Sequence, residues 1–424
     1  MSRSVRPGKQ QAMPVTDGTT TDKRSWRRTA LQPVRGPGAA LTAGSAALVV
    51  AAGVAIVAFG SPGSHAAPVT AAKHSSVTAA RQPAAPLQVL SVTPAAGEHG
   101  VNGAAPIRVQ FSAPLAADTP MPQLSPQVAG DWQVRGDTAV FTPAVGYFQD
   151  TRVTVKIPGG ASGMISVAGA SAGAGGVLAS AVTESFTTGW FGTLRLQQLF
   201  AQLGYLPLTW SPASGPVIRP GNANAELSAA YQPPAGTFSW QGGYPSNLTD
   251  QWQAGAGNIL DVGAIRAFES VHGLTMDGYA GQAVWSDLLT AAAKGQGNPN
   301  GYTYALASQN SPERITIWHD GRVVLRSPVN TGIAASPTVD GTFPVYLKFY
   351  FTYMKGTNPD GSKYDDPVYY ANYFNGGDAV HQFARGSYGW YQSLGCVELP
   401  WDAAKTAYSY LNYGSLVTVI GPVA

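Results

Sequence analysis

The chain has 424 residues, of which only 12% are charged, and it contains 50 glycines and 32 prolines. This length exceeds what one ordinary domain needs, so two to four domains are expected. The composition indicates β-rich, loop-rich domains of extracellular type rather than a coiled coil. The net charge is +3, but residues 1–36 carry +6, which leaves the remainder at about −3 and without a basic surface for nucleic acid.

A long apolar run follows the basic N-terminal tail of residues 1–36. Ala39 to Phe59 is a stretch of 21 residues without a charge, and about 20 apolar residues span a bilayer as a helix. The basic flank places the N-terminus in the cytoplasm. The sequence therefore predicts a transmembrane helix at residues 37–60 and a single-pass cell-membrane protein whose other domains are extracellular. The alternative is a signal peptide cleaved near Ser64–Ala66 and a secreted protein.

A Pro/Ala/Ser/Thr-rich linker at residues 61–86 precedes a segment of short apolar alternations. In residues 87–189 the alternation has a period of two, as in Ile107–Phe111, and Pro and Gly interrupt it. This pattern predicts a β-sandwich. The sequence at 140–147, followed by Thr151–Val155, resembles bacterial immunoglobulin-like surface domains, which implies a spacer or docking role.

Residues 190–294 change to helical spacing of apolar residues, at 194–203, 261–272 and 284–289. This segment resembles the small three-helix peptidoglycan-binding domain of wall enzymes. The matching residues are Phe268, Gly273, Leu274, Asp277, Gly278, Gly281 and Trp285. The stretch 207–256 departs from that pattern, and we interpret it as a loop over the binding face. The alternative is a helical spacer with Trp285 in its core.

The last segment, residues 302–424, returns to strands. Arg314–His319 and Arg322–Arg326 flank Asp320-Gly321, which is a hairpin signal. Residues 346–374 are dense in Tyr and Phe and predict a partly exposed aromatic groove or lid. Asp402–Asn412 predicts a short helix, and residues 415–420 a closing strand.

This segment contains Cys396, the only cysteine of the chain. Outside the cytoplasm structural cysteines normally form disulfides, so an unpaired one indicates a reactive thiol. The alternative is a buried structural cysteine. Of the two histidines in the segment, His319 lies in a predicted turn, whereas His381 follows a predicted short strand that would hold it rigidly. Gly395 allows a sharp turn that leaves backbone amides available for an oxyanion hole. Cysteine and histidine together indicate acyl transfer through a thioester.

The segment resembles the mainly-β L,D-transpeptidase catalytic domain. The matching pieces are Asn330–Gly332, Pro337–Phe343, Val380-His381 and Ser393–Val397. The resemblance implies that Cys396 is the nucleophile and His381 the general base. It further implies that the backbone amides of Leu394, Gly395 and Cys396 form the oxyanion hole.

Three positions depart from the family pattern. Leu394 stands where a second histidine is usual, Glu398 where Asn or Arg is common, and Gln382 where Gly or Ser is usual. Leu394 still offers a backbone N–H. The departures bear on substrate preference, rate and sensitivity to β-lactams rather than on the reaction class.

The implied function is the cross-linking of third-position diamino acids of peptidoglycan stem peptides, with release of D-Ala. Partners would be stem peptides and glycan, the membrane, and carbapenem-type inhibitors; no metal or other cofactor is implied. Arg385, Trp390 and Tyr391 are candidate substrate contacts, with ordinary loop packing as the alternative. Two other functions stay open: an L,D-carboxypeptidase or wall hydrolase that uses water as acceptor, and a catalytically weak wall-binding protein.

Overall fold

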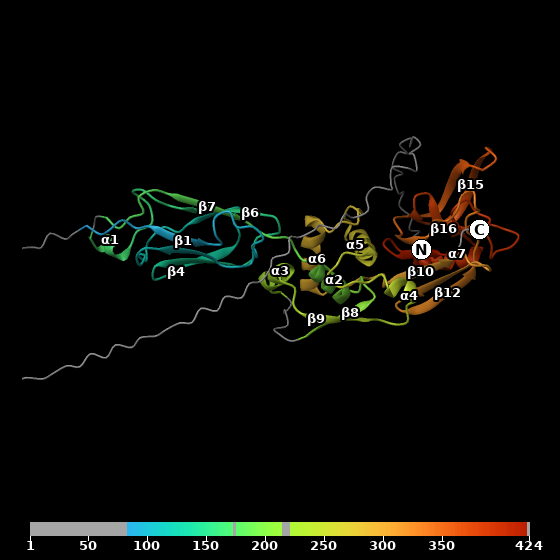
Figure 1. Cartoon of the computed structure of the whole chain (residues 1–424), viewed down its shortest axis with the longest axis horizontal. Coiled ribbons are helices and arrows are strands. Elements are labelled where there is room, and N and C mark those ends of the chain that lie inside the picture. The colour runs from blue at the N-terminus through green and yellow to red at the C-terminus, as the bar shows by residue number, and fades with distance from the viewer. Residues whose placement is uncertain (1–82, 173–174, 214–220, 422–424) are drawn as a thin grey trace, which may run out of the picture. The chain divides into compact units, whose positions relative to one another are not determined.

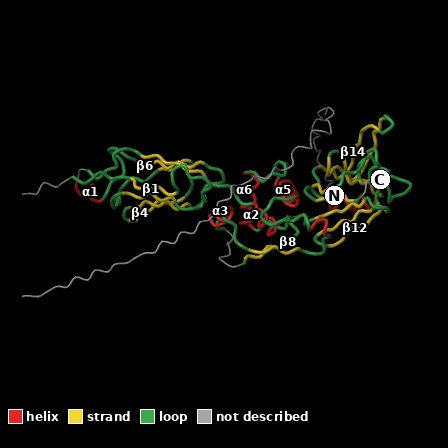
Figure 2. Tube along the Cα trace, viewed as in Figure 1, coloured by secondary structure: helices red, strands yellow, loops and turns green. Residues whose placement is uncertain are grey.

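The computed structural model describes residues 83–172, 175–213 and 221–421 (Figure 1, Figure 2). The predicted basic tail and transmembrane helix, and the linker up to residue 82, lie outside these residues. Within the three described ranges, no helix combines the length and apolar composition needed to cross a membrane.

Residues 87–189 form the predicted β-sandwich, whose paired strands are antiparallel. Its elements are β1 (Val89–Thr93), β2 (Ile107–Phe111), β3 (Gln123–Ser125), β4 (Gly130–Arg135), β5 (Thr138–Pro143), β6 (Arg152–Ile157), α1 (Val167–Ala172) and β7 (Val182–Thr187). One sheet has the order β1-β2-β5-β4 and the other β3-β6-β7. In β2, buried Ile107, Val109 and Phe111 alternate with exposed residues, because one face of each sheet covers the core.

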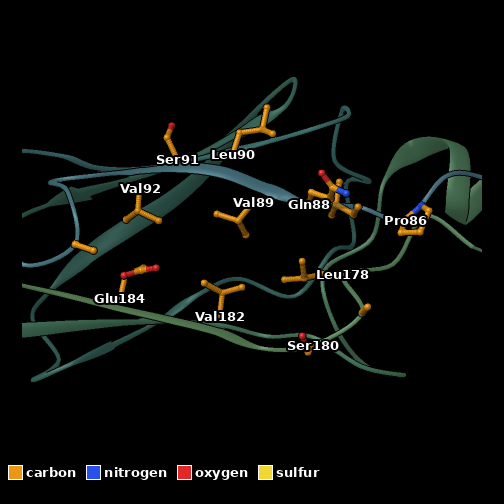
Figure 3. A pocket seen from close by; sticks show the side chains of 13 residues that line it. Pro86, Gln88, Val89, Leu90, Ser91, Val92, Leu178, Ser180, Val182 and Glu184 are labelled. Carbon is orange, nitrogen blue, oxygen red and sulfur yellow. The ribbon is translucent and has the colours of Figure 1, made fainter.

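A hollow of about 440 Å³ opens between the edge strands β1 and β7 of this sandwich (Figure 3). Val89, Val92 and Val182 line it, and Glu184 lies at its border. Neither Cys396 nor His381 contributes to it, so it does not belong to the predicted active site.

Residues 190–294 contain the three predicted helices at the expected places. The elements are α2 (Thr193–Gln202), β8 (Leu208–Pro212), α3 (Ala223–Tyr231), β9 (Gly236–Trp240), α4 (Ser246–Thr249), α5 (Ile259–His272) and α6 (Gln282–Lys294). Helix α5 begins at a capping box in which Asn258 and Asp261 bond to each other's backbone. It ends at Gly273, whose φ of 68° is the left-handed conformation that glycine adopts without strain.

The interpretation of residues 207–256 as a loop over a binding face was wrong. This stretch contains the β8–β9 hairpin, α3 and α4, and it contributes Leu208, Leu227 and Leu248 to the core shared with α2, α5 and α6. The domain therefore has more than three helices, because α3 and α4 cover apolar side chains of α2, α5 and α6 that would otherwise face solvent. Phe268 and Trp285, two of the residues that carry the resemblance, are buried in the same core. Peptidoglycan binding stays a prediction.

The last domain consists of two sheets around one core. Its elements are β10 (Thr303–Ser308), β11 (Arg314–His319), β12 (Arg322–Pro328), β13 (Gly341–Pro344), β14 (Leu347–Thr357), β15 (Lys363–Asn375), β16 (Asp378–Gln382), β17 (Val397–Leu399), α7 (Trp401–Tyr410) and β18 (Leu416–Ile420). The sheet orders are β12-β11-β10-β18-β13 and β14-β15-β16-β17. The hairpin, short helix and closing strand predicted from sequence are confirmed.

A buried ion pair ties α3 to α2 and tests whether the stretch 207–256 belongs to the domain. Arg195 Nη2 lies 2.6 Å from Glu226 Oε2, and the two side chains are 2% and 10% exposed. We expect Glu226→Ala to destabilise the domain by about 3–5 kcal/mol, because it leaves a buried guanidinium without its counter-charge. Thermal unfolding of the full chain measures this loss, and Glu226→Gln, which keeps a hydrogen-bond acceptor, should lose less. An unchanged transition would contradict the assignment.

Candidate active site

The parallel pairing of β16 with β17 brings the predicted catalytic residues together. Val380 pairs with Val397, and His381 pairs with Glu398. Because side chains alternate along a strand, Val380 and Val397 face the core, and His381 and Glu398 face the other side of the sheet. Cys396, directly before Val397, therefore lies on the same side as His381. Strand pairing and alternation thus put the two residues on one face of the sheet, and their catalytic roles stay a prediction.

The sulfur of Cys396 lies in a half-buried site that disfavours the thiolate. Met354 Sδ and the carbonyl oxygen of Gly377 are each 3.9 Å from Sγ. Burial raises the pKa of the Cys396 thiol to about 12; the backbone N–H of Ala379 lowers it, while the charges of Asp378 and Glu398 raise it. At neutral pH the thiol is protonated, so a nucleophilic reaction needs a base beside it.

His381 has the protonation state of such a base. Its ring is 3% exposed, and Nδ1 lies 2.8 Å from the Gln382 carbonyl oxygen. A carbonyl only accepts, so Nδ1 carries the proton and Nε2 keeps a free lone pair. Burial lowers the pKa of His381. The Gln382 carbonyl and the Glu398 charge act in the opposite direction, but the effect of burial is larger. Within the described part of the chain no hydrogen bond joins the ring to Cys396 Sγ. Hydrogen bonds between catalytic groups are often long in a free enzyme and shorten when substrate binds.

The turn before Cys396 is held by residues 331–336. Ser393 N donates to the Thr331 carbonyl at 2.9 Å, and Ser336 Oγ donates to the Leu394 carbonyl at 2.9 Å. The N–H of Gly395 donates to Ser393 Oγ at 3.3 Å, so this amide already has a partner inside the turn. The oxyanion hole of Leu394, Gly395 and Cys396 stays a prediction.

Gly395 is required here for two reasons. Its φ is +115°, a backbone conformation that side chains strongly disfavour. A Cβ at this position would lie 2.3 Å from Asp378 Oδ1, which is less than any real contact. The carboxylate of Asp378 therefore lies directly against the residue that precedes Cys396.

Arg385 and Glu398 form an ion pair that the sequence did not reveal. Arg385 Nε donates to Glu398 Oε2 at 2.8 Å and Nη2 to Oε1 at 2.7 Å, a bidentate geometry. Nη2 also donates to the Gln392 carbonyl at 3.2 Å. The pair thus fastens the loop between β16 and β17 to β17 itself. Arg385 was predicted as a substrate contact; in this structure Glu398 occupies its guanidinium, and a contact to substrate stays a prediction.

The other two candidate contacts lie on the same loop. Trp390 is 52% and Tyr391 51% exposed. The preceding Gly389 donates its N–H to the Val329 carbonyl and to Asn330 Oδ1, which fixes the base of this segment. Both rings are thus outside the core, and their contact with substrate stays a prediction. Among the described residues, no group of three His, Cys, Asp or Glu side chains could hold a metal ion.

Two family models match the chain. Residues 303–419 match the L,D-transpeptidase catalytic domain, and residues 83–188 match a bacterial Ig-like domain. No curated protein matches. These matches confirm the family expected for the last domain and the immunoglobulin-like character of the sandwich.

Solved structures similar to this chain are L,D-transpeptidases. The L,D-transpeptidase from Mycobacterium smegmatis is 16% identical, covering 79% of this chain and 100% of its own, with a TM-score of 0.27. L,D-transpeptidase 3 from Mycobacterium tuberculosis in complex with a faropenem-derived adduct is 16% identical; the match covers 78% of this chain and 98% of that one, with a TM-score of 0.26. The catalytic domain from the E. faecium L,D-transpeptidase is 28% identical; the match covers 28% of this chain and 96% of that one, with a TM-score of 0.26.

The positive φ of Gly395 gives a test of the turn. We expect Gly395→Ala to destabilise the chain by about 1–3 kcal/mol, because it adds backbone strain and displaces the Asp378 carboxylate. Gly386→Ala on the same loop is the control, since a Cβ there meets nothing within 4 Å. Thermal unfolding compares the two variants, and equal transitions would show that the turn is not under this constraint.

The Arg385–Glu398 pair should contribute more than an exposed pair. Its side chains are 29% and 5% exposed, whereas those of Lys355 and Asp365, 2.9 Å apart, are 69% and 55% exposed. A double-mutant cycle to Ala should give a coupling energy of about 1–3 kcal/mol for the first pair and below about 1 kcal/mol for the second. Denaturant unfolding measures both. Coupling that is no larger at Arg385–Glu398 would contradict its role in fastening the loop.

Proposed function

Since residues 303–419 match the L,D-transpeptidase catalytic domain, we propose that this protein is a peptidoglycan L,D-transpeptidase that uses Cys396 as its nucleophile. It joins the third-position diamino acids of two stem peptides and releases D-Ala. The observation that carries the proposal is the placement of the chain's single cysteine on the sheet face that holds His381, directly after the Gly395 turn.

In the proposed reaction Cys396 gives its proton to Nε2 of His381 while its sulfur attacks the carbonyl carbon of the bond between the diamino acid and the terminal D-Ala. Backbone N–H groups of the turn stabilise the oxyanion. His381 then returns the proton to the leaving amine, D-Ala departs, and an acyl-thioester remains on Cys396. The side-chain amine of a second stem attacks the thioester and frees the thiol.

The electrostatics of the free enzyme support this sequence of steps. The raised pKa of the thiol and the lowered pKa of His381 both favour the neutral pair over the thiolate–imidazolium pair. The proton then moves only as the attack develops, which makes His381 a general base in the transition state rather than the partner of a resting ion pair.

The other parts of the chain fit a protein that works at the cell wall. In this proposal residues 37–60 anchor the chain in the cell membrane, or are removed as a signal, and the catalytic domain acts outside. The helical domain docks on peptidoglycan, and the immunoglobulin-like domain acts as a spacer. Carbapenem-type β-lactams acylate Cys396, since the ring carbonyl presents the same electrophile as the stem peptide.

Product analysis by mass spectrometry tests the proposed reaction. The full chain is incubated with purified muropeptides that carry tetrapeptide stems. We expect cross-linked dimers and free D-Ala, and neither from Cys396→Ala. Tripeptide without dimers would replace the proposal by an L,D-carboxypeptidase that uses water. The absence of any Cys396-dependent product would leave a wall-binding protein.

A further inference from the structure

Glu313 is a buried carboxylate that the proposed reaction does not use. It directly precedes β11 and is 2% exposed. Within the described ranges no ion pair joins it to a basic side chain. Burial raises the pKa of Glu313; hydrogen bonds from Thr331 act in the opposite direction, but the effect of burial is larger. A buried carboxylate without a counter-charge is costly, so stability alone does not account for this residue.

Both oxygens of this carboxylate accept hydrogen bonds from one residue, the fully buried Thr331. Thr331 donates its backbone N–H to Oε2 of Glu313 at 2.6 Å and its hydroxyl to Oε1 at 2.7 Å. The same hydroxyl lies 3.4 Å from Gln309 Oε1. Because two bonds join one residue to one carboxylate, they fix the orientation of the Thr331 peptide group as well as its position.

The carbonyl of Thr331 faces the loop that carries Cys396. It accepts hydrogen bonds from the N–H groups of Gln392 and Ser393, each at 2.9 Å. The hydroxyl of Ser393 in turn donates to the Cys396 carbonyl at 2.6 Å and accepts the Gly395 N–H at 3.3 Å. An unbroken series of hydrogen bonds thus connects the buried carboxylate with the backbone of Cys396.

The backbone of Glu313 holds the same loop at a second point. Its N–H donates to the Gly389 carbonyl at 2.7 Å, and its carbonyl accepts the Val329 N–H at 3.1 Å. The N–H of Gly389 donates to the Val329 carbonyl at 2.8 Å, which closes this group of bonds. Backbone and side chain of Glu313 therefore hold two separate points of the loop, one at residue 389 and one at residues 392–393.

We propose that Glu313 is a positioning residue, which holds the Thr331 peptide group and, through it, the turn that presents Cys396 to the substrate. The inference rests on the proposed function. Residues 383–396 contain no helix or strand, so hydrogen bonds from neighbouring segments set the place of the sulfur. A displacement of about 1 Å at a reacting atom can slow a reaction about a hundredfold, so these bonds bear directly on the rate.

Glu313→Leu tests this role, because leucine fills the site without accepting a hydrogen bond. The full chain is treated with a carbapenem, and mass spectrometry of the intact chain follows the adduct on its only cysteine. An unfolded fraction lowers the final amount of adduct, whereas a displaced thiol lowers the rate at which the adduct forms. We expect this rate to fall about ten- to hundredfold, and kcat for dimer formation to fall with it.

Three further variants separate positioning from stability and from charge. Ile317→Ala removes a fully buried side chain of β11, so it should lower the melting temperature and leave the rate unchanged. Glu313→Gln keeps an oxygen for the Thr331 N–H, and its amide donates to the Thr331 hydroxyl, whose proton then turns to Gln309. Its rate should stay within about threefold of wild type. Thr331→Val loses only the hydroxyl and should be about three- to tenfold slower.

The inference is wrong if Glu313→Leu is folded and acylates at the wild-type rate, or if Ile317→Ala slows acylation as much. If Glu313→Leu does not fold, a wild-type rate in Thr331→Val overturns it. A Glu313→Gln chain as slow as the leucine variant would mean that the charge acts rather than the hydrogen bonds, and this result also overturns the inference.

The outcomes also separate this inference from the proposed function. Wild-type chain that forms dimers, together with Glu313→Leu and Thr331→Val chains that react at its rate, overturns the role of Glu313 alone. Wild-type chain that yields neither dimer nor adduct overturns the transpeptidase and, with it, the role of Glu313. Slow acylation confined to Glu313→Leu and Thr331→Val, with dimers from the wild-type chain, supports both.

Discussion

The short parallel pairing of β16 with β17 is the constraint on which the candidate site depends. Three residue pairs fix which side of the sheet His381, Cys396 and Glu398 occupy. A shift of one residue would turn Cys396 into the core and bring Val397 to the active face. Val380 and Val397 are both fully buried, so such a shift would be costly. Apolar packing on one face of the sheet therefore fixes the strand register, and with it the positions of His381 and Cys396 on the other face.

The loop that joins these strands carries the second constraint. Parallel strands need a long connection, and here it spans residues 383–396 without helix or strand. Asn330, Thr331 and Ser336 bind it from the neighbouring segment, and the Arg385–Glu398 pair fastens it to β17. Glu398 in β17, where the family commonly has Asn or Arg, is therefore matched by Arg385 on the loop that precedes this strand.

Charge around Cys396 bears on the order of the proposed steps. Burial and two carboxylates hold the thiol in its protonated form, and burial holds His381 neutral. The thiolate is thus disfavoured in the resting site. Substrate must supply the interactions that make the proton transfer favourable. In the proposed location outside the membrane, this would protect a thiol that has no second cysteine in the chain to pair with.

The sequence by itself determined the period-2 strands of the sandwich and the three main helices, and it singled out Cys396 and His381 as candidates for the site. These follow from local periodicity and from the chemistry of single residues. Only the tertiary structure decided that residues 207–256 complete the helical core, that Arg385 is bound to Glu398, and that Asp378 lies against Gly395. These three features depend on which side chains meet across loops and strand edges. Arg385 and Glu398 are 13 positions apart, and Asp378 and Gly395 are 17 apart, so no periodicity in the sequence indicates their contacts. Packing and strand register create them.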